Sequence, residues 1–443
     1  MDDVTPASER QAPAREHRAD EPGLVYPGMW VVFIVLICCF TTWGVAADLT
    51  TPMVAGFKRI FDMSTFQASL VQLAYFGAYF LLALPAAFIN ERFGYKTGIL
   101  TGLILAAAGS FAFYPASKLM TYTAFLAALF AIAAGCSILE TSANPYVISL
   151  GPEENATRRL NFAQAFNPVG TNIGVLLAAT LILPQLEDPV NLASLTPEQV
   201  QAIRAGELGA VMGPYLGLGF VLLAIALVIA ISKSPKIVEE FESGDLGGRS
   251  PFSILLRNRR YTFGVVAQFF NVAAQVCTWT YLIQYVQQAL DGSLQLGGYL
   301  LQVSLIVFLV SRFFMTWVIG RVRATVVLAL LSGLAVALCA FAVVSPNVAG
   351  VAAVVALSFC LSLMFPTIYG VALAGLGPAT KFGAAGLVMA IVGGAIVPLV
   401  QGALLDATSP AVSFLVPAVC FAVVGSYALF DLKAERASPA GAP

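Results

Sequence analysis

The stretch ILETSANPY, residues 138–146, places one acidic side chain, that of Glu140, between two long apolar segments. A charged side chain at the centre of a lipid bilayer costs roughly 2.5–3.5 kcal/mol, so an acid in such a place is usually functional. Burial in an apolar medium favours the neutral form of a carboxyl group, which allows it to gain and lose a proton near neutral pH. We therefore interpret Glu140 as a proton carrier. The alternative is a buried hydrogen-bonding group that only stabilises the structure.

The composition of the chain is that of a membrane protein. Hydrophobic residues make up 59% of the 443 residues and charged residues only 11%, compared with about 25% in a soluble domain. Apolar runs of about 20 residues, each long enough to cross a hydrocarbon core, recur along the chain. The sequence predicts an all-α integral membrane protein with twelve transmembrane helices, at residues 27–52, 64–90, 95–115, 120–150, 155–183, 209–232, 258–289, 295–320, 324–345, 347–376, 380–405 and 410–431.

The distribution of Lys and Arg predicts how these helices are oriented. Most of the 23 basic residues fall in loops and tails on the side that holds both termini, and the positive-inside rule assigns that side to the cytoplasm. We expect a multi-pass protein of the inner (plasma) membrane with both termini cytoplasmic and an extracytoplasmic loop at 184–208. The predicted order is a disordered cytoplasmic tail (1–26), a first six-helix half (27–232), a cytoplasmic linker (233–257), a second six-helix half (258–431) and a cytoplasmic tail (432–443).

The two predicted halves contain an internal repeat. Gln72 precedes INERFGYKTG at the end of the second helix, and Gln302 precedes IGRVRATVV at the end of the eighth. SANPYVISL in the fourth helix and FPTIYGVAL in the tenth each have a proline followed by a tyrosine. Parallel six-helix halves joined by a cytoplasmic linker are the layout of the major facilitator fold, in which substrate binds near the middle of the membrane between the halves.

Amide and aromatic side chains recur on one face of several predicted helices. Amides both donate and accept hydrogen bonds, and an aromatic face covers the apolar C–H side of a sugar ring, so the combination suits a neutral, hydroxyl-rich ligand. The alternative is that the amides only hold helices together, at about 0.6 kcal/mol each. Arg312, the one basic residue away from the ends of a predicted helix, is expected to have a structural or gating role. The predicted substrate-binding residues are Gln72, Tyr75, Asn144, Asn161, Gln164, Asn167, Gln268, Asn271, Gln275 and Trp279.

Other kinds of site are not indicated. The seven cysteines lie in apolar runs and are interpreted as packing residues. The single histidine, His17, is in the N-terminal tail, and the sequence has no metal-ligand spacing and no paired catalytic acids. We therefore expect no cofactor, no metal, no nucleic-acid partner and no enzyme activity, and a monomer in contact with membrane lipid.

Several of these segments resemble the L-fucose permease branch of the major facilitator superfamily. The most specific strings are LETSANP (139–145) and RLNFAQAFN (159–167), and the resemblance covers roughly residues 28–430. It implies a symporter that brings a neutral hexose or deoxyhexose into the cell, commonly driven by protons, with Glu140 as the membrane-embedded acid. Amides of that branch correspond to Asn161, Gln164, Gln268 and Gln275.

One departure from that branch affects the predicted coupling. The branch reads L-N-D late in the first helix, and its aspartate is a second acid tied to proton coupling, whereas this chain has Thr51 there. Asp48 lies about one helical turn earlier, and we predict that it replaces the missing acid; substrate or another ion bound by Asp48 is the alternative. Thr51 is added to the predicted substrate-binding residues. Asn271 and Gln284 stand where an aromatic and a basic residue are common in the branch.

Together these features predict a secondary active transporter that imports a neutral monosaccharide, L-fucose or a related hexose, by proton symport and alternating access. Its expected partners are a small sugar and a proton, with sodium as the alternative ion. A sodium-coupled sugar symporter, a uniporter, a multidrug exporter and a sugar sensor that does not transport remain alternatives.

Overall fold

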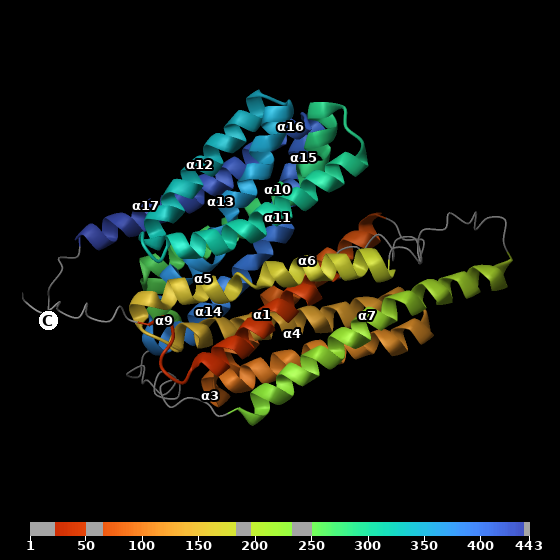
Figure 1. The fold of residues 1–443 in the computed structure, drawn as a ribbon, viewed down its shortest axis with the longest axis horizontal. Helices are drawn as coiled ribbons and strands as arrows, with labels where there is room; N and C mark the ends of the chain where they lie inside the picture. The colour runs from red at the N-terminus through yellow and green to blue at the C-terminus, as the bar shows by residue number, and fades with distance from the viewer. Residues whose placement is uncertain (1–22, 50–64, 183–195, 233–249, 438–443) are drawn as a thin grey trace, which may run out of the picture.

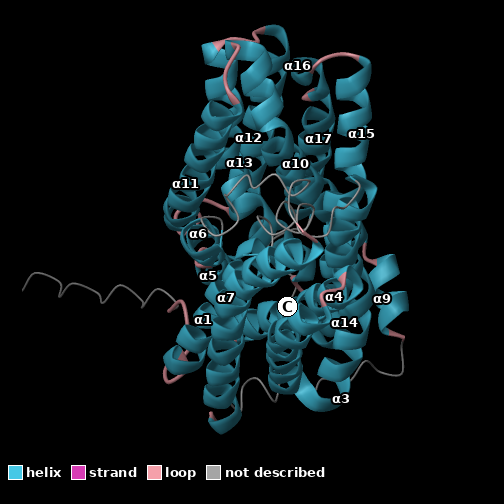
Figure 2. Ribbon diagram, turned by 90° about the vertical axis from the view of Figure 1, so that its right-hand side faces the viewer, coloured by secondary structure: helices cyan, strands magenta, loops and turns pink. Residues whose placement is uncertain are grey.

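The computed structural model describes residues 23–49, 65–182, 196–232 and 250–437, which form two bundles of helices (Figure 1). Every regular element in these ranges is helical (Figure 2), which confirms the all-α fold predicted from the apolar runs. The first bundle contains α1 (Trp30–Leu49), α3 (Thr65–Leu119), α4 (Tyr122–Ser149), α5 (Ala156–Gln164), α6 (Asn167–Leu177) and α7 (Pro197–Ile231). The second contains α9 (Pro251–Arg257), α10 (Arg259–Leu290), α11 (Leu294–Val318), α12 (Ala324–Val344), α13 (Val348–Leu373), α14 (Thr380–Met389), α15 (Gly393–Ala407), α16 (Pro410–Ser413) and α17 (Leu415–Ala437).

Nine helical segments in the described part of the chain are long and apolar enough to cross a membrane. Helix α3 counts once among them although it contains two predicted spans, which meet at Gly94. Gly94 has a φ of 81°, a left-handed conformation that glycine adopts without strain. The other two missing spans are α10, which is too polar, and the α5–α6 pair, whose members are too short. These are the helices with most of the amides predicted to bind substrate.

Two predicted spans are interrupted near the middle of the molecule. The fifth is divided into α5, which ends at Gln164, and α6; the eleventh is divided into α14 and α15 by a 3-10 turn, Ala390–Val392. Pro168 explains the first break, because its nitrogen cannot donate the hydrogen bond that the Gln164 carbonyl would accept in a continuous helix. The Arg312 guanidinium of α11 donates to this carbonyl instead, with Nη1 3.3 Å from the oxygen.

Helix α7 is longer than the predicted sixth span, 209–232. It begins at Pro197, where a capping box stabilises its first turn. Residues 197–208 of the predicted loop are therefore helical, whereas the apolar part of α7 long enough to cross a membrane, Met212–Ile231, agrees with the predicted span. Several predicted segments lie partly outside the described residues. These parts include 1–22 of the N-terminal tail, 50–52 of the first helix, 184–195 of the loop, 233–249 of the linker and 438–443 of the C-terminal tail. The rest of the linker contains α9.

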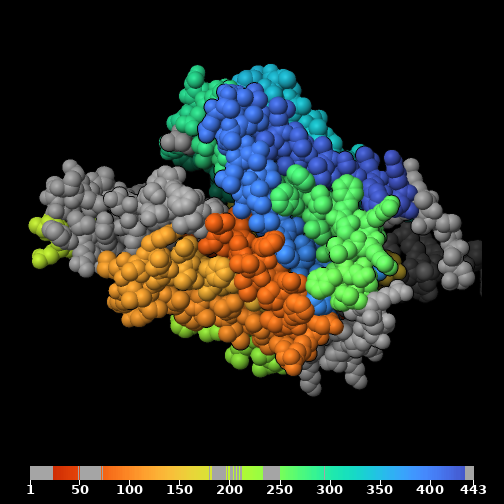
Figure 3. Space-filling model, turned by 180° about the vertical axis from the view of Figure 1, so that it is seen from behind, coloured from red at the N-terminus to blue at the C-terminus, as the bar shows by residue number. Residues whose placement is uncertain are grey.

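The two bundles meet at the end of the molecule near residues 23 and 437, which we call the closed end. There α14 packs against α3 and α4, and α13 packs against α5. Across this contact Lys381 Nζ lies 3.2 Å from Glu91 Oε2, and the ring of Phe88 packs edge-on against that of Phe382. A space-filling view from behind shows the halves in contact here (Figure 3), whereas toward the opposite end α15 and α16 lie apart from α1 and α7 (Figure 1). The bundles thus converge at the closed end and diverge toward the other.

Hydrophobic side chains fill both bundles and also cover their outer faces. One buried cluster lies in the second bundle, and another fills the first bundle and extends into α13 and α14 at the closed end. Large apolar side chains such as Leu73, Val310 and Leu330 are more than half exposed on the outside. Such surfaces suit contact with lipid chains and not with water.

The closed end contains a close approach that a larger residue would disturb. A Cβ atom added to Gly370 of α13 would lie 2.7 Å from Thr157 Oγ1 and 3.1 Å from Thr157 Cα. Overpacking costs about 1–3 kcal/mol, so Gly370→Val should destabilise the contact between the bundles at the closed end. We predict that this variant shifts the protein toward a conformation in which the bundles are separated there. Spin labels at Arg92 and Arg321 should then report longer distances, whereas Gly333→Val, with no atom within 4 Å of its added Cβ, should leave them unchanged. Unchanged distances in Gly370→Val would contradict this packing.

Candidate functional site

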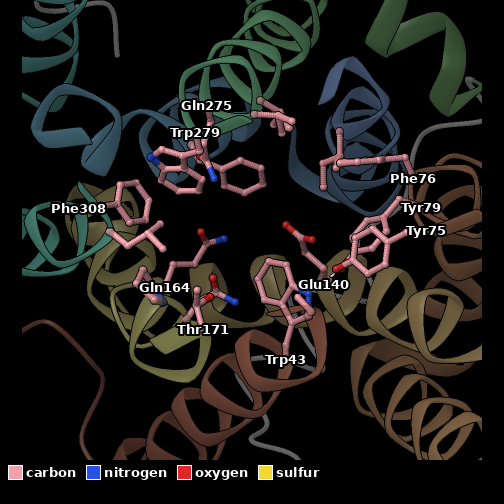
Figure 4. Close-up of a pocket in the computed structure, with 18 of the residues that line it drawn as sticks. Trp43, Tyr75, Phe76, Tyr79, Glu140, Gln164, Thr171, Gln275, Trp279 and Phe308 are labelled. Atoms are coloured by element: carbon pink, nitrogen blue, oxygen red, sulfur yellow. Dashed lines mark hydrogen bonds between the residues drawn. The ribbon is translucent and has the colours of Figure 1, made fainter. Parts of the chain in front are cut away.

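A cavity of about 340 Å³ lies between the two bundles, near the lower end of the range of roughly 300–1,000 Å³ for small-ligand pockets. Helices α1, α3, α4, α5 and α6 line it from the first bundle, and α10, α11 and α13 from the second. Figure 4 shows aromatic rings around its wall with a carboxylate and amides pointing inward. The polar and aromatic lining residues include Trp43, Tyr75, Phe76, Tyr79, Glu140, Gln164, Asn167, Thr171, Asn172, Gln275, Trp279, Phe308, Arg312 and Phe365.

Glu140 of α4 lies on the wall of this cavity. Its side chain is 1% exposed, and neither carboxylate oxygen has a hydrogen-bond partner among the described residues. The carboxylate points into the cavity, as does the amide of Gln164 (Figure 4). The proton-carrier role of this acid and the alternative of a structural hydrogen-bonding group both stay predictions.

Arg312 lines the same cavity from the second bundle. Its Cζ lies 5.1 Å from the ring centroid of Phe308, and its Nη1 donates to the Gln164 carbonyl. Its Nε has no hydrogen-bond partner among the described residues. Glu140 and Arg312 are thus an acid and a base contributed by opposite bundles, so separation of the halves would move them apart. The gating role expected for Arg312 stays a prediction.

Two tryptophans form walls of the cavity, and each is fixed by a hydrogen bond within its own bundle. Trp43 Nε1 donates to the hydroxyl of Tyr79 over 2.6 Å. Trp279 Nε1 donates to Ser358 Oγ over 3.0 Å, and this oxygen lies 2.6 Å from Ser304 Oγ. Since both indole N–H groups are already used by the protein, the rings offer mainly apolar surface to a ligand. That surface suits the C–H side of a sugar ring.

The predicted substrate-binding residues fall into three groups. Those that line the cavity are Tyr75, Gln164, Asn167, Gln275 and Trp279. Those that are fully buried and do not line it are Asn144, Asn161, Gln268 and Asn271. The side chain of Gln72 lies outside the described residues, as does Thr51 altogether; the side chain of Asp48, predicted as a coupling acid, lies outside them too. Contact of these residues with substrate, and proton coupling by Glu140 and Asp48, stay predictions.

Sequence reasoning missed much of the aromatic wall. An aromatic residue in an apolar helix is as compatible with lipid as with a cavity, so Trp43, Phe76 and Phe365 had no distinguishing signal. Phe308 had one, because it lies four residues before Arg312 and therefore on the same helical face. Asn172, which directly follows Thr171, is a further lining residue that the polar pattern of this helix could have indicated.

Known proteins share this architecture. Residues 32–391 match the family model described as Major Facilitator Superfamily. The chain is 38% identical over 374 residues to the L-fucose-proton symporter of Haemophilus influenzae, covering 83% of this chain and 87% of that protein. It is 34% identical over 400 residues to the glucose/galactose transporter of Brucella abortus biovar 1, covering 90% and 93%. The crystal structure of the transporter FucP in the outward conformation superposes with a TM-score of 0.84 at 36% identity, covering 90% of this chain and 98% of that one.

The hydrogen bond from Trp279 to Ser358 generates a prediction about affinity. Ser358→Ala frees the indole, and loss of one hydrogen bond of about 0.5–1.5 kcal/mol should raise the dissociation constant of L-fucose or galactose about two- to tenfold in equilibrium binding. Ser332→Ala is the matched control, because that buried hydroxyl donates to the Leu328 carbonyl of its own helix. Wild-type affinity in Ser358→Ala would show that Trp279 needs no such support.

Proposed function

Because the chain belongs to the major facilitator superfamily, we infer that it is a secondary active transporter that imports a neutral monosaccharide, L-fucose or a related hexose, by proton symport with alternating access. Its relatives at 38% and 34% identity are an L-fucose-proton symporter and a glucose/galactose transporter. These relatives are transporters and not enzymes, and we assign this chain to the same class.

The observation that supports this function best is the state of Glu140. An acid that is 1% exposed and has no hydrogen-bond partner among the described residues is costly when charged and inexpensive when protonated. It lies in the wall of a cavity that both bundles line and that contains amides and tryptophans. A proton on Glu140 and a sugar can therefore bind in the same cavity between the halves, which allows their transport to be coupled.

The cavity has the chemistry that a neutral sugar requires. Gln164, Asn167 and Gln275 supply amides that donate to and accept from hydroxyl groups. Trp43 and Trp279, from opposite bundles, supply apolar ring surface. Because both bundles contribute to the lining, a bound sugar contacts both halves at once.

We propose the following transport cycle. Glu140 takes a proton from the side on which the cavity opens, sugar binds, the halves rock, and sugar and proton leave on the other side. A ligand can drive this change only through different affinities for the two conformations. Protonation supplies such a difference, because it removes the charge that makes a dry, closed cavity around Glu140 costly.

We further propose that the closed end faces the cytoplasm. The basic residues of the inner loops support this orientation, since they lie on the side of the closed end. Both termini would then be cytoplasmic, and the cavity would open to the outside. We also propose that the protein is a monomer of the inner (plasma) membrane, surrounded by lipid, with halves at 27–232 and 258–431. The similarity to a relative solved in an outward conformation supports the same orientation.

A sodium-coupled sugar symporter or a uniporter is the second candidate. Thr51 in place of the second acid is the observation that favours it. Purified protein in liposomes, tested with labelled monosaccharides under an imposed pH or sodium gradient, separates these functions. Uptake of lipophilic cations without sugar would instead indicate a multidrug exporter, and sugar binding without uptake would indicate a sensor.

The role of Glu140 predicts a separation of two activities. Glu140→Gln mimics the neutral acid, so it should lose accumulation of sugar driven by a pH gradient while sugar exchange continues and no longer depends on pH. Uptake and counterflow in liposomes measure the two activities. Glu140→Asp, which can still bind a proton, should retain some accumulation. Concentrative uptake at the wild-type level in Glu140→Gln would exclude this role.

The role of Asp48 predicts a second effect on coupling. If Asp48 replaces the acid that the resemblance places at Thr51, Asp48→Asn should lower the number of protons carried per sugar, and Asp48→Glu should restore it. The reversal potential of sugar flux in liposomes gives this ratio. An unchanged proton-to-sugar ratio in Asp48→Asn would show that Asp48 takes no part in coupling.

A further inference from the structure

Four fully buried amides lie between the cavity and the closed end, and we call them the inner amide layer: Asn144, Asn161, Gln268 and Asn271. Each has a side chain that is 0% exposed. Asn144 follows Glu140 by one turn of α4 toward the closed end, and Asn161 precedes Gln164 by about one turn of α5 in the same direction.

The other two amides extend a stripe that begins in the cavity. Gln268 precedes Gln275 by two turns of α10, so it lies on the same helical face about 10 Å closer to the closed end. Asn271 lies between them at the edge of this face. The stripe therefore leads from the cavity lining into the buried contact between the bundles.

Hydrogen bonds connect this layer to the cavity and across the two halves. Gln164 Nε2, in the cavity wall, donates to Asn144 Oδ1 over 2.8 Å. Asn161 Nδ2 donates to Thr367 Oγ1 of α13 over 3.3 Å, which joins the first bundle to the second. The layer thus lies where the halves must separate if the closed end opens.

Much of the hydrogen-bonding capacity of the layer is unused in this conformation. Asn161 Oδ1 and both polar atoms of Gln268 and Asn271 have no hydrogen-bond partner among the described residues. Buried polar groups are normally paired, and an unpaired one raises the free energy of the conformation that buries it. Apolar residues would close this contact more favourably, so the amides oppose closure.

We propose that the inner amide layer is a second sugar-binding position, which contacts the sugar after the closed end opens. Amides that can both donate and accept fit the hydroxyl groups of a neutral polyol. Their unpaired atoms also keep the two conformations close in free energy, because opening gives these groups sugar or water to bind. This proposal rests on the proposed sugar transport.

Apolar substitutions in the layer test it. Gln268→Met and Asn271→Leu should each slow exchange of L-fucose or galactose across liposomes by about tenfold, while the dissociation constant measured in the cavity-open conformation changes less than about twofold. Spin labels at Arg92 and Arg321 should show a smaller open fraction at the closed end without sugar. Gln401→Leu is the matched control, because Gln401 is a fully buried amide of α15 with an unpartnered Oε1 outside this layer.

Several results would overturn the proposal. Wild-type exchange in both layer variants would do so, as would a loss of affinity as large as the loss of exchange, which would place these amides in the cavity site itself. Shifted distances with unchanged exchange would also exclude a sugar position. If the wild-type protein moves no sugar, the proposed function fails, and the distances without sugar still test whether the amides oppose closure.

Discussion

The structure depends on how a carboxyl group is kept inside an apolar bundle. Glu140 is surrounded by protein and has no described hydrogen-bond partner, so its environment favours the neutral form unless an opposite charge or water approaches. The basic side chain in the same cavity wall, Arg312, belongs to the other half. We propose that the charge of Glu140 is linked to the arrangement of the halves, and that the aromatic and amide lining binds a sugar in the same cavity.

The interrupted helices make this arrangement possible. Irregular backbone at membrane depth is tolerated only where it faces protein or a cavity, and the breaks after Gln164 and at Ala390–Val392 both lie beside the cavity. Pro168 removes a helical donor, and the free carbonyl of Gln164 accepts from Arg312 across the halves. One missing backbone N–H thus orients the basic side chain that shares the cavity with Glu140.

The sequence predicted the helices and the acid better than the cavity. Apolar runs indicated the helices because lipid imposes one length and one polarity, and Glu140 was found because a carboxylate is exceptional there. The paired serines that hold Trp279 were missed, because a serine in a helix usually bonds its own backbone, as Ser332 does. The start of α7 at Pro197 was missed because its first turns are polar. Which amides line the cavity and which lie in the inner amide layer depends on the packing of the halves, and helical spacing alone does not give that.

The central claim is that Glu140 changes protonation when sugar binds. The most direct test is to count the protons taken up on sugar binding, by titration calorimetry of the purified protein in buffers with different ionisation enthalpies, from mildly acidic to alkaline pH. We predict proton uptake at pH values at which Glu140 is charged in the protein without sugar. At lower pH, where Glu140 is already protonated before sugar binds, the uptake should be smaller or absent. Sugar binding with no proton uptake at any pH in this range would contradict it.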